Sequence, residues 1–251
     1  MNSTPKLFAT FALSAALCAQ GDLEARLDAV AEFSRYFKKA KQEALQVEAV
    51  LTLEGNECAP AADALIKLLG HKAAGVRESA WRVLASFEEQ ATFQRWIDGL
   101  AKEKDARRAA VTIKVLGRSK IRGALAAIEA YVEGAKRLDG GVKYEVARAL
   151  AAIGAEGEAG VLGGLLSASE APVRVAACDA VRALRAKLLG GEVTALLADK
   201  EWQVQAAAIE AVAALRPQSA VQPLIDLMRR SGRLRTECAD ALFRITALDF
   251  G

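Results

Sequence analysis

GVRESAWRVLASF, residues 75–87, is the segment that decides the fold, because five similar segments follow it with a period of about 30 residues. The other copies are KDARRAAVTIKVL (104–116), GVKYEVARALAAI (141–153), PVRVAACDAVRAL (172–184), QVQAAAIEAVAAL (203–215) and RLRTECADALFRI (233–245). Apolar residues recur at offsets of 4, 4 and 3, from Val76 to Phe87 in the first copy, and only the second copy breaks the pattern, with Asp105 at its first position. This spacing traces one face of an α-helix, so each copy predicts a helix.

A second apolar segment precedes each of these predicted helices. The preceding segments are 61–70, 92–101, 124–133, 158–167, 191–200 and 221–230, mostly separated from their neighbours by glycine, proline or short polar clusters. The repeated unit is therefore helix, turn, helix. Two such helices cannot bury their apolar stripes alone, but stacked neighbours can. We expect an all-α solenoid of about six to seven helical hairpins.

Two copies share a Val-Arg step at the start of the second helix, Val76-Arg77 and Val173-Arg174, with alanine four residues after the valine and leucine or valine eight after it. Weaker copies are Val142-Lys143, Val204-Gln205 and Leu234-Arg235, while Asp105-Ala106 departs from the pattern. The array, about residues 58–246, resembles the HEAT family, in its short bacterial form with phycobilin-lyase-type repeats. The resemblance implies a right-handed α-α superhelix whose second helices line the concave face. It says almost nothing about function.

The first twenty-one residues have the layout of a secretory signal peptide. Lys6 precedes an apolar run from Leu7 to Ala19, and Ala19-Gln20-Gly21 offers a cleavage site before Asp22. The run is shorter than a membrane span, and no other segment is long and apolar enough for one. We expect a periplasmic or secreted protein with signal peptide 1–21; the alternative is a buried first helix.

Residues 22–57 are predicted to form capping helices at the start of the array. In the first of them Leu23, Leu27, Val30, Phe33 and Phe37 share one face. Asp22 is a candidate N-cap of that helix. A second helix is expected from Ala44 to Leu53. At the other end, residues 247–251 form a tail that is either the point of truncation of a longer protein or a short frayed terminus.

The residues that carry chemistry are few. Net charge is +3 from 34 basic and 31 acidic residues, so binding of a polyanion is permitted but not indicated, and nucleic acid is an unlikely partner. The single histidine, His71, lies in a turn where solvent exposure is expected, and it leaves no basis for a zinc site, a di-iron site or a catalytic triad. Cys58, Cys178 and Cys238 are expected to be buried and unpaired. We predict no catalytic, cofactor-binding or metal-binding residue, and no enzymatic activity.

One repeated surface position offers a candidate partner-binding site. Six residues after the first apolar position, the copies read Arg82, Val111, Arg148, Asp179, Glu210 and Asp240. A surface running from basic to acidic could orient a partner, with Trp81 and Tyr144 as anchors at the basic end. The alternative is that these are solvated charges whose signs fell by chance. Arg77, Arg174 and Arg235 are expected to bond to neighbouring turns or acids, and Trp96 and Trp202 to pack between repeats.

These observations favour an exported, monomeric scaffold that binds another, unidentified protein through its concave face. One alternative is a lyase-type or enzyme accessory module, which predicts a pocket with convergent polar groups around a cofactor. Another is a polyanion binder, for polysaccharide or nucleic acid, which predicts steep salt dependence. A third is a spacer within a larger protein.

Overall fold

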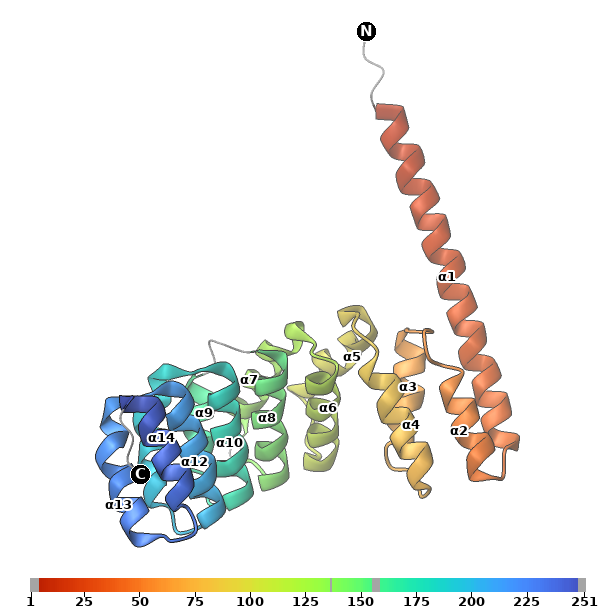
Figure 1. Cartoon of the computed structure of the whole chain (residues 1–251). Coiled ribbons are helices and arrows are strands. Elements are labelled where there is room, and N and C mark those ends of the chain that lie inside the picture. Colours follow the sequence, from red (N-terminus) through yellow and green to blue (C-terminus); the bar gives the residue numbers. More distant parts are fainter. Residues whose placement is uncertain (1–4, 136, 155–158, 248–251) are drawn as a thin grey trace. The chain divides into compact units, whose positions relative to one another are not determined.

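A computed structural model describes the backbone of residues 5–135, 137–154 and 159–247, and the side chains of residues 22–247 except 136 and 155–159. Every regular element within these residues is an α-helix or a short 3-10 helix (Figure 1). The chain divides into two compact units, Met1–Arg95 and Trp96–Gly251, and the division falls inside helix α5 (Gln90–Leu100). The tail expected at 247–251 lies outside the described residues from 248 onward.

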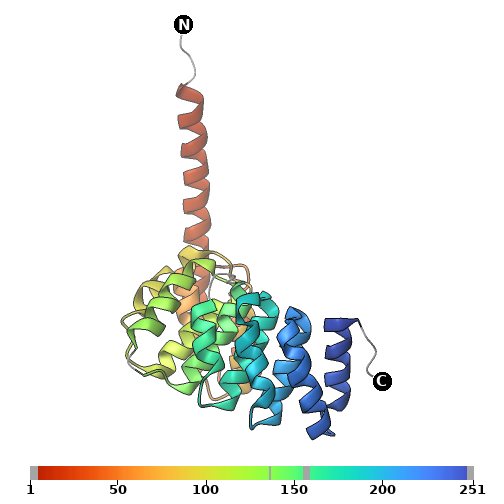
Figure 2. The same cartoon turned by 90° about the vertical axis from the view of Figure 1, so that its left-hand side faces the viewer.

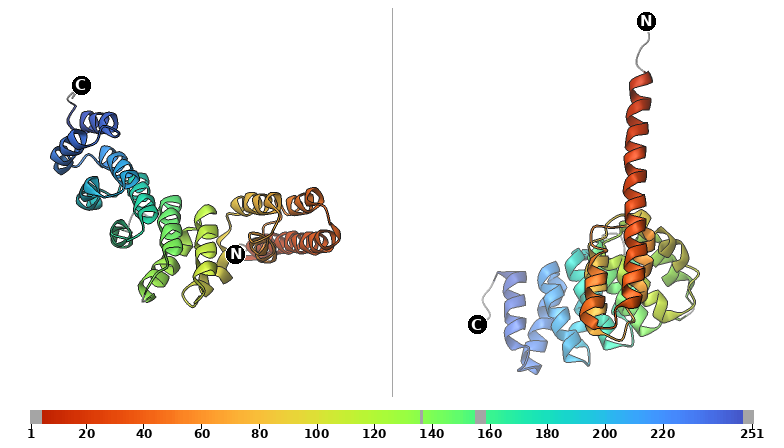
Figure 3. Two further views of the ribbon diagram at one scale, coloured as in Figure 1. Left: turned by 90° about the horizontal axis from the view of Figure 1, so that it is seen from below. Right: turned by 90° about the vertical axis from the view of Figure 1, so that its right-hand side faces the viewer.

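The N-terminal unit consists of one long helix, three short ones and the start of α5. The four are α1 (Pro5–Lys39), α2 (Glu43–Leu51), α3 (Ala59–Leu68) and α4 (Ala74–Ala85). The N-terminal part of α1 projects beyond α2 and α3 (Figure 2), and only its C-terminal part lies beside them (Figure 3).

Helix α1 differs from its expected form. It continues through Gly21 and Asp22, so Asp22 is not the N-cap of a helix in this chain. No proline follows Pro5 before the end of α1, and its alanines and leucines favour helix, so nothing interrupts it. Of the predicted apolar face, Phe33 is buried, but Leu23 and Leu27 are 47% and 42% exposed.

The C-terminal unit is an all-α solenoid built as two layers of helices. The second helices are α6 (Ala106–Arg118), α8 (Gly140–Ile153), α10 (Ala171–Leu184), α12 (Trp202–Leu215) and α14 (Arg235–Thr246). They pack side by side in chain order and form the second-helix layer (Figure 3). The first-helix layer holds α7 (Leu125–Gly134), α9 (Ala159–Leu166), α11 (Gly190–Ala195) and α13 (Val221–Arg230), with 3-10 turns at Arg122–Ala124, Lys187–Leu189, Leu196–Ala198 and Gln218–Ala220.

The repeated apolar positions form the core, as predicted. The second position of the 4-4-3 pattern is fully buried in every copy: Ala80, Ala109, Val146, Ala177, Ala208 and Cys238. One deviation is Asp105, which is exposed and caps α6 by accepting hydrogen bonds from the backbone N–H groups of Arg107 (2.9 Å) and Arg108 (3.1 Å). The buried valine or leucine that the other copies have at this position is thus replaced here by a helix cap.

Helices α6 and α8 approach each other closely at one glycine. A Cβ atom placed on Gly117 would lie 2.7 Å from both the Cα and the Cβ of Ala149, a distance that real side chains do not adopt. Gly117 and Ala149 are both buried, so the spacing between the two helices depends on the absence of one methyl group.

The three described cysteines are buried, and the single histidine packs against neighbouring residues. Cys58, Cys178 and Cys238 are buried and unpaired, as predicted, and burial raises the pKa of Cys178 to about 12 and that of Cys238 to about 11. His71 is half-buried and not freely exposed. Its Nδ1 accepts a hydrogen bond from the Ala73 backbone N–H (3.2 Å), and its ring meets that of Phe37 edge-on, with centroids 5.9 Å apart.

Candidate functional site

A groove lies between α8 and α10 in the second-helix layer and has a volume of about 450 Å³; it is called the α8–α10 groove below. Helix α8 contributes Tyr144, Arg148, Ala151 and Ala152, and α10 contributes Val175, Ala176, Asp179, Ala180, Arg182 and Ala183. The alanines on both helices leave this space open, because their side chains end at Cβ. The groove is thus lined mainly by small apolar residues with polar side chains among them.

The polar side chains of the α8–α10 groove form one contact pair on each helix. On α8, Arg148 Nη1 donates a hydrogen bond to the Tyr144 hydroxyl (3.1 Å), and its guanidinium carbon lies 5.7 Å from the Tyr144 ring centroid. The hydrogen bond to Tyr144 raises the pKa of Arg148, so this guanidinium is cationic at any physiological pH. On α10, Arg182 Nη2 lies 3.3 Å from Asp179 Oδ1.

Three of the predicted site residues, Tyr144, Arg148 and Asp179, therefore line one groove. Glu210 and Asp240 are exposed on α12 and α14 of the same unit, whereas half-buried Trp81 and exposed Arg82 lie on α4 of the N-terminal unit. The remaining predicted positions are thus spread over three other helices.

Neighbouring charges moderate the predicted run from basic to acidic. Besides the Asp179–Arg182 pair, Glu210 lies 4.0 Å from Arg244. In the N-terminal unit, Arg82 lies 3.7 Å from Glu54. Both members of each pair are exposed, so each pair is weak but lowers the net local charge.

A smaller hollow of about 60 Å³ between α6 and α8 continues the α8–α10 groove, since the two share Arg148 and Ala152. Lys114, on α6, lines this hollow and lies 3.7 Å from Glu145 on α8. The groove and the hollow together therefore form a continuous depression on the second-helix layer that reaches from α10 across α8 to α6.

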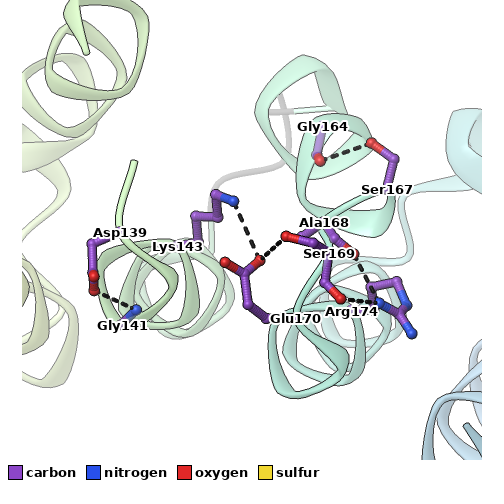
Figure 4. Close-up of polar contacts among 9 residues, drawn as sticks. All are labelled: Asp139, Gly141, Lys143, Gly164, Ser167, Ala168, Ser169, Glu170 and Arg174. Carbon is purple, nitrogen blue, oxygen red and sulfur yellow. Dashed lines mark hydrogen bonds and ion pairs between the residues drawn. The ribbon is translucent and has the colours of Figure 1, made fainter. Parts of the chain in front are cut away.

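The recurring arginines have the structural role that the sequence predicts at two of three positions. Arg174 Nη1 donates to the carbonyls of Ala168 (2.8 Å) and Ser169 (2.9 Å), as Figure 4 shows. Its Nε and Nη2 each donate to Asp199, at 2.8 Å. Arg77 Nη1 donates to the carbonyls of His71 (2.7 Å) and Lys72 (2.9 Å). Arg235 is exposed.

A second polar link joins α8 to the loop before α10. Lys143 Nζ lies 3.3 Å from Glu170 Oε2, and the Ser169 hydroxyl donates to the same oxygen at 2.9 Å (Figure 4). Lys143 occupies the repeat position of Arg174. A lysine at this position therefore also contacts the following hairpin.

Trp202 does not pack between repeats, contrary to the prediction. Its side chain is 46% exposed, and the guanidinium carbon of Arg233 lies 4.5 Å from the centroid of its ring. Trp202 is the first residue of α12 and stands two positions before the buried Val204. That offset already placed it outside the 4-4-3 face.

Metal ligands do not gather in the described part of the chain. No group of three or more His, Cys, Asp or Glu side chains there lies in a way that could hold a metal ion. Among the described residues, no helix combines the length and the apolar character needed to cross a bilayer.

The stacked hairpins define the architecture. The chain is a helical repeat protein. No protein-family model and no curated protein matches it. Among solved structures, one engineered protein is 22% identical with a TM-score of 0.45, over 74% of this chain and 96% of that one. Another engineered protein is 22% identical with a TM-score of 0.46, over 89% and 70%.

The complex of CpcE and CpcF of phycocyanin lyase from Nostoc sp. PCC7120 is also similar. It is 18% identical with a TM-score of 0.44, over 88% of this chain and 93% of that one. Similarities of this size carry no argument about what the present chain binds or does.

Proposed function

We propose that this chain is an exported HEAT-type scaffold that binds another protein through the exposed side of its second-helix layer, with the α8–α10 groove at the centre of the contact. The signal-peptide pattern of residues 1–21 supports export. The repeat fold supports scaffolding, since stacked hairpins present extended surfaces that suit protein partners.

The observation that carries the proposal is the composition of the α8–α10 groove. Its small apolar lining accepts side chains of a partner, while Tyr144 and Arg148 are residue types that dominate binding energy at protein interfaces. The Tyr144–Arg148 contact holds both side chains in place before a partner arrives, which reduces the entropy lost on binding.

The lyase-type or cofactor-binding alternative receives less support from this groove. A cofactor site needs polar groups that converge on the ligand. Here Arg148 is engaged by Tyr144, and Asp179 by Arg182 on its own helix. The proposal therefore assigns no catalytic residue.

Site-specific photo-crosslinking in the cell envelope tests the proposal. A photo-reactive amino acid at Ala183, which is exposed in the α8–α10 groove, should crosslink one defined protein, and the same amino acid at Glu192, exposed on α11, should not. The crosslink should disappear on addition of Arg148→Glu and persist with Lys187→Glu, an equal change of charge in the 3-10 turn before α11. Crosslinking from both positions, or resistance to Arg148→Glu, would contradict a site in the groove.

Export has its own test. A fusion of residues 1–30 to a reporter enzyme that is active only outside the cytoplasm should give activity, and the exported chain should begin at Asp22. Replacement of Leu13 and Leu17 by arginine should abolish export, because the apolar run would be broken. An exported chain that still starts at Met1 would show that the segment is not a cleaved signal.

A further inference from the structure

The end of α13, the start of α14 and the loop between them, here called the arginine loop, concentrate positive charge. Residues 227–236 hold four arginines and no acidic residue, against a net charge of +3 for the whole chain. All four side chains are exposed: Arg229, Arg230, Arg233 and Arg235.

These four guanidinium groups lack acidic partners within the described part of the chain. Elsewhere, Arg95, Arg174 and Arg182 each lie within 4 Å of a carboxylate oxygen. Of the four, Arg230 Nε donates to the Asp226 carbonyl (3.2 Å), and Arg233 stacks on Trp202; no ion pair to a described carboxylate accompanies either contact. The positive charge of this loop is therefore available to an external anion.

Trp202 gives the loop an aromatic platform. Its indole ring is 46% exposed, and the guanidinium carbon of Arg233 lies 4.5 Å from the ring centroid. A guanidinium stacked in this way still presents its N–H donors at its edges, where a carboxylate can accept two hydrogen bonds in parallel. Stacking also restricts the Arg233 side chain before binding.

Beside this loop is a cavity of about 740 Å³ between α11 with its following 3-10 turn and α13. Arg229 and Arg230 form its basic wall, and Ala195, Ala198 and Pro223 are among its apolar lining residues. Since α11 leads into the loop before Trp202 and α13 leads into the arginine loop, the cavity and the platform lie at the same edge of the C-terminal unit. The arginine edge is defined here as Arg229, Arg230, Arg233 and Trp202 with this cavity.

The lining favours an acidic peptide over other polyanions. A peptide carries apolar side chains that can fill the cavity beside Ala195 and Pro223, whereas a polysaccharide chain offers none. Asp226 also lines the cavity, and its carboxylate disfavours a ligand with closely spaced charges, such as a nucleic-acid backbone. A peptide whose carboxylates are separated by apolar residues fits both the apolar lining and the presence of Asp226.

We propose that the arginine edge is a second binding site, which takes an extended peptide segment of a partner protein in which glutamate or aspartate alternates with apolar residues. The site involves the first-helix layer, the α13–α14 loop and the first residue of α12, and it does not depend on the α8–α10 groove.

Fluorescence anisotropy at fixed ionic strength tests this proposal with the whole exported chain and a labelled twelve-residue peptide of alternating glutamate and leucine. The peptide with glutamine in place of glutamate should bind about tenfold more weakly or worse, because charge-assisted hydrogen bonds are lost. The double variant Arg229→Glu/Arg230→Glu should lose at least as much affinity for the glutamate peptide. Trp202→Ala should lose a smaller factor, about fivefold.

The matched control is Lys104→Glu/Lys187→Glu, which changes the net charge equally at exposed positions outside the arginine edge. Its affinity should stay within about twofold of that of the original chain. Arg148→Glu should also leave this affinity unchanged, which separates the arginine edge from the groove.

Equal binding of the glutamine peptide, or equal losses in the control, would overturn the proposal. Tighter binding of heparin or single-stranded DNA, lost in the same arginine variant, would overturn it in favour of a general polyanion surface. Arg233→Gln provides a milder second variant, whose circular dichroism and melting temperature should match those of the original chain because the side chain is exposed.

Discussion

Arg77 and Arg174 occupy the same position of two repeats but have different surroundings. Each donates through Nη1 to the carbonyls six and five residues earlier, so each closes the loop within its own hairpin. Arg174 is also buried and paired with Asp199 from the next hairpin, whereas Arg77 is half-buried and has no carboxylate within 4 Å among the described residues. Both arginines therefore close the loop of their own hairpin. Only Arg174 also links its hairpin to the next one.

The largest effect is expected for Arg174→Ala. The substitution leaves the Asp199 carboxylate buried without its counter-charge and two carbonyls without their donor, so the free energy of unfolding should fall by about 3–5 kcal/mol. Urea denaturation followed by circular dichroism measures this. A loss no larger than that of Arg77→Ala would show that the ion pair adds nothing to loop closure.

Removing both partners should be less harmful than removing one. In Arg174→Met/Asp199→Leu no buried charge remains, so the double variant should recover about 1–3 kcal/mol relative to Arg174→Ala. The comparison with Asp199→Leu alone completes a mutant cycle. Additive losses across that cycle would mean that the two side chains act independently despite their 2.8 Å contacts.

The pair should also make stability depend on pH. Burial acts to raise the pKa of Asp199, but hydrogen bonds from Arg174 and from the Glu201 backbone N–H lower it below its usual value of 3.8. A carboxyl with a lowered pKa in the folded state stabilises the fold above pH 3.8, and this contribution is lost as the pH falls through the folded-state pKa.

Unfolding free energies between pH 5 and pH 2 should therefore fall more steeply for the original chain than for Asp199→Asn. Glu170, Glu103 and Asp105, whose pKa values are also lowered, remain in both chains and cancel in the difference. Parallel curves would assign the acid sensitivity to those groups and not to Asp199.

Arg77→Ala should cost less, about 1–1.5 kcal/mol, because it removes hydrogen bonds to two carbonyls but strands no buried charge. Arg77→Lys, which keeps the charge but not the planar donor group, should recover only part of this loss. Full recovery with lysine would show that charge alone stabilises the loop. Thermal unfolding of the three chains distinguishes the outcomes.

The smallest effect is expected where the recurring arginine is missing. The equivalent residue at the start of α6 is Ala106, and the loop before it relies on the Asp105 cap. Asp105→Ala should cost about 1 kcal/mol and Asp105→Asn much less, since asparagine also caps helices. Equal losses for both would point to the charge of Asp105 and not to its cap.

Much of the fold could be predicted because helical periodicity is a local property of the sequence. The offsets of 4, 4 and 3 located the second helices, and the fully buried Ala177 and Cys238 confirm the face. For Arg174, the sequence predicts a bond to a neighbouring turn or acid but does not identify the acid. The partner Asp199 is 25 residues away and is brought close by the conformation of a loop, which no periodicity records.

The candidate site was predicted in part for a similar reason. The offset of Arg148 and Asp179 from the core face placed both on the surface of their helices. The hollow between them depends on alanines such as Ala152 and Ala180, which read in sequence only as helix formers. The exposure of Trp202 follows from its offset of two positions from Val204, which places it on the side of α12 opposite the buried face.

The contact of Gly117 with Ala149 has a mechanical consequence. In a quasi-one-dimensional stack, each hairpin touches only its neighbours, so a displacement at one interface is carried by everything beyond it. A methyl group at Gly117 would push α8 away from α6, and α10, α12 and α14 would move with it as the arm of a lever. The absence of a Cβ atom at Gly117 thereby sets the alignment of the distal hairpins. It also sets the orientation of the arginine edge relative to α6.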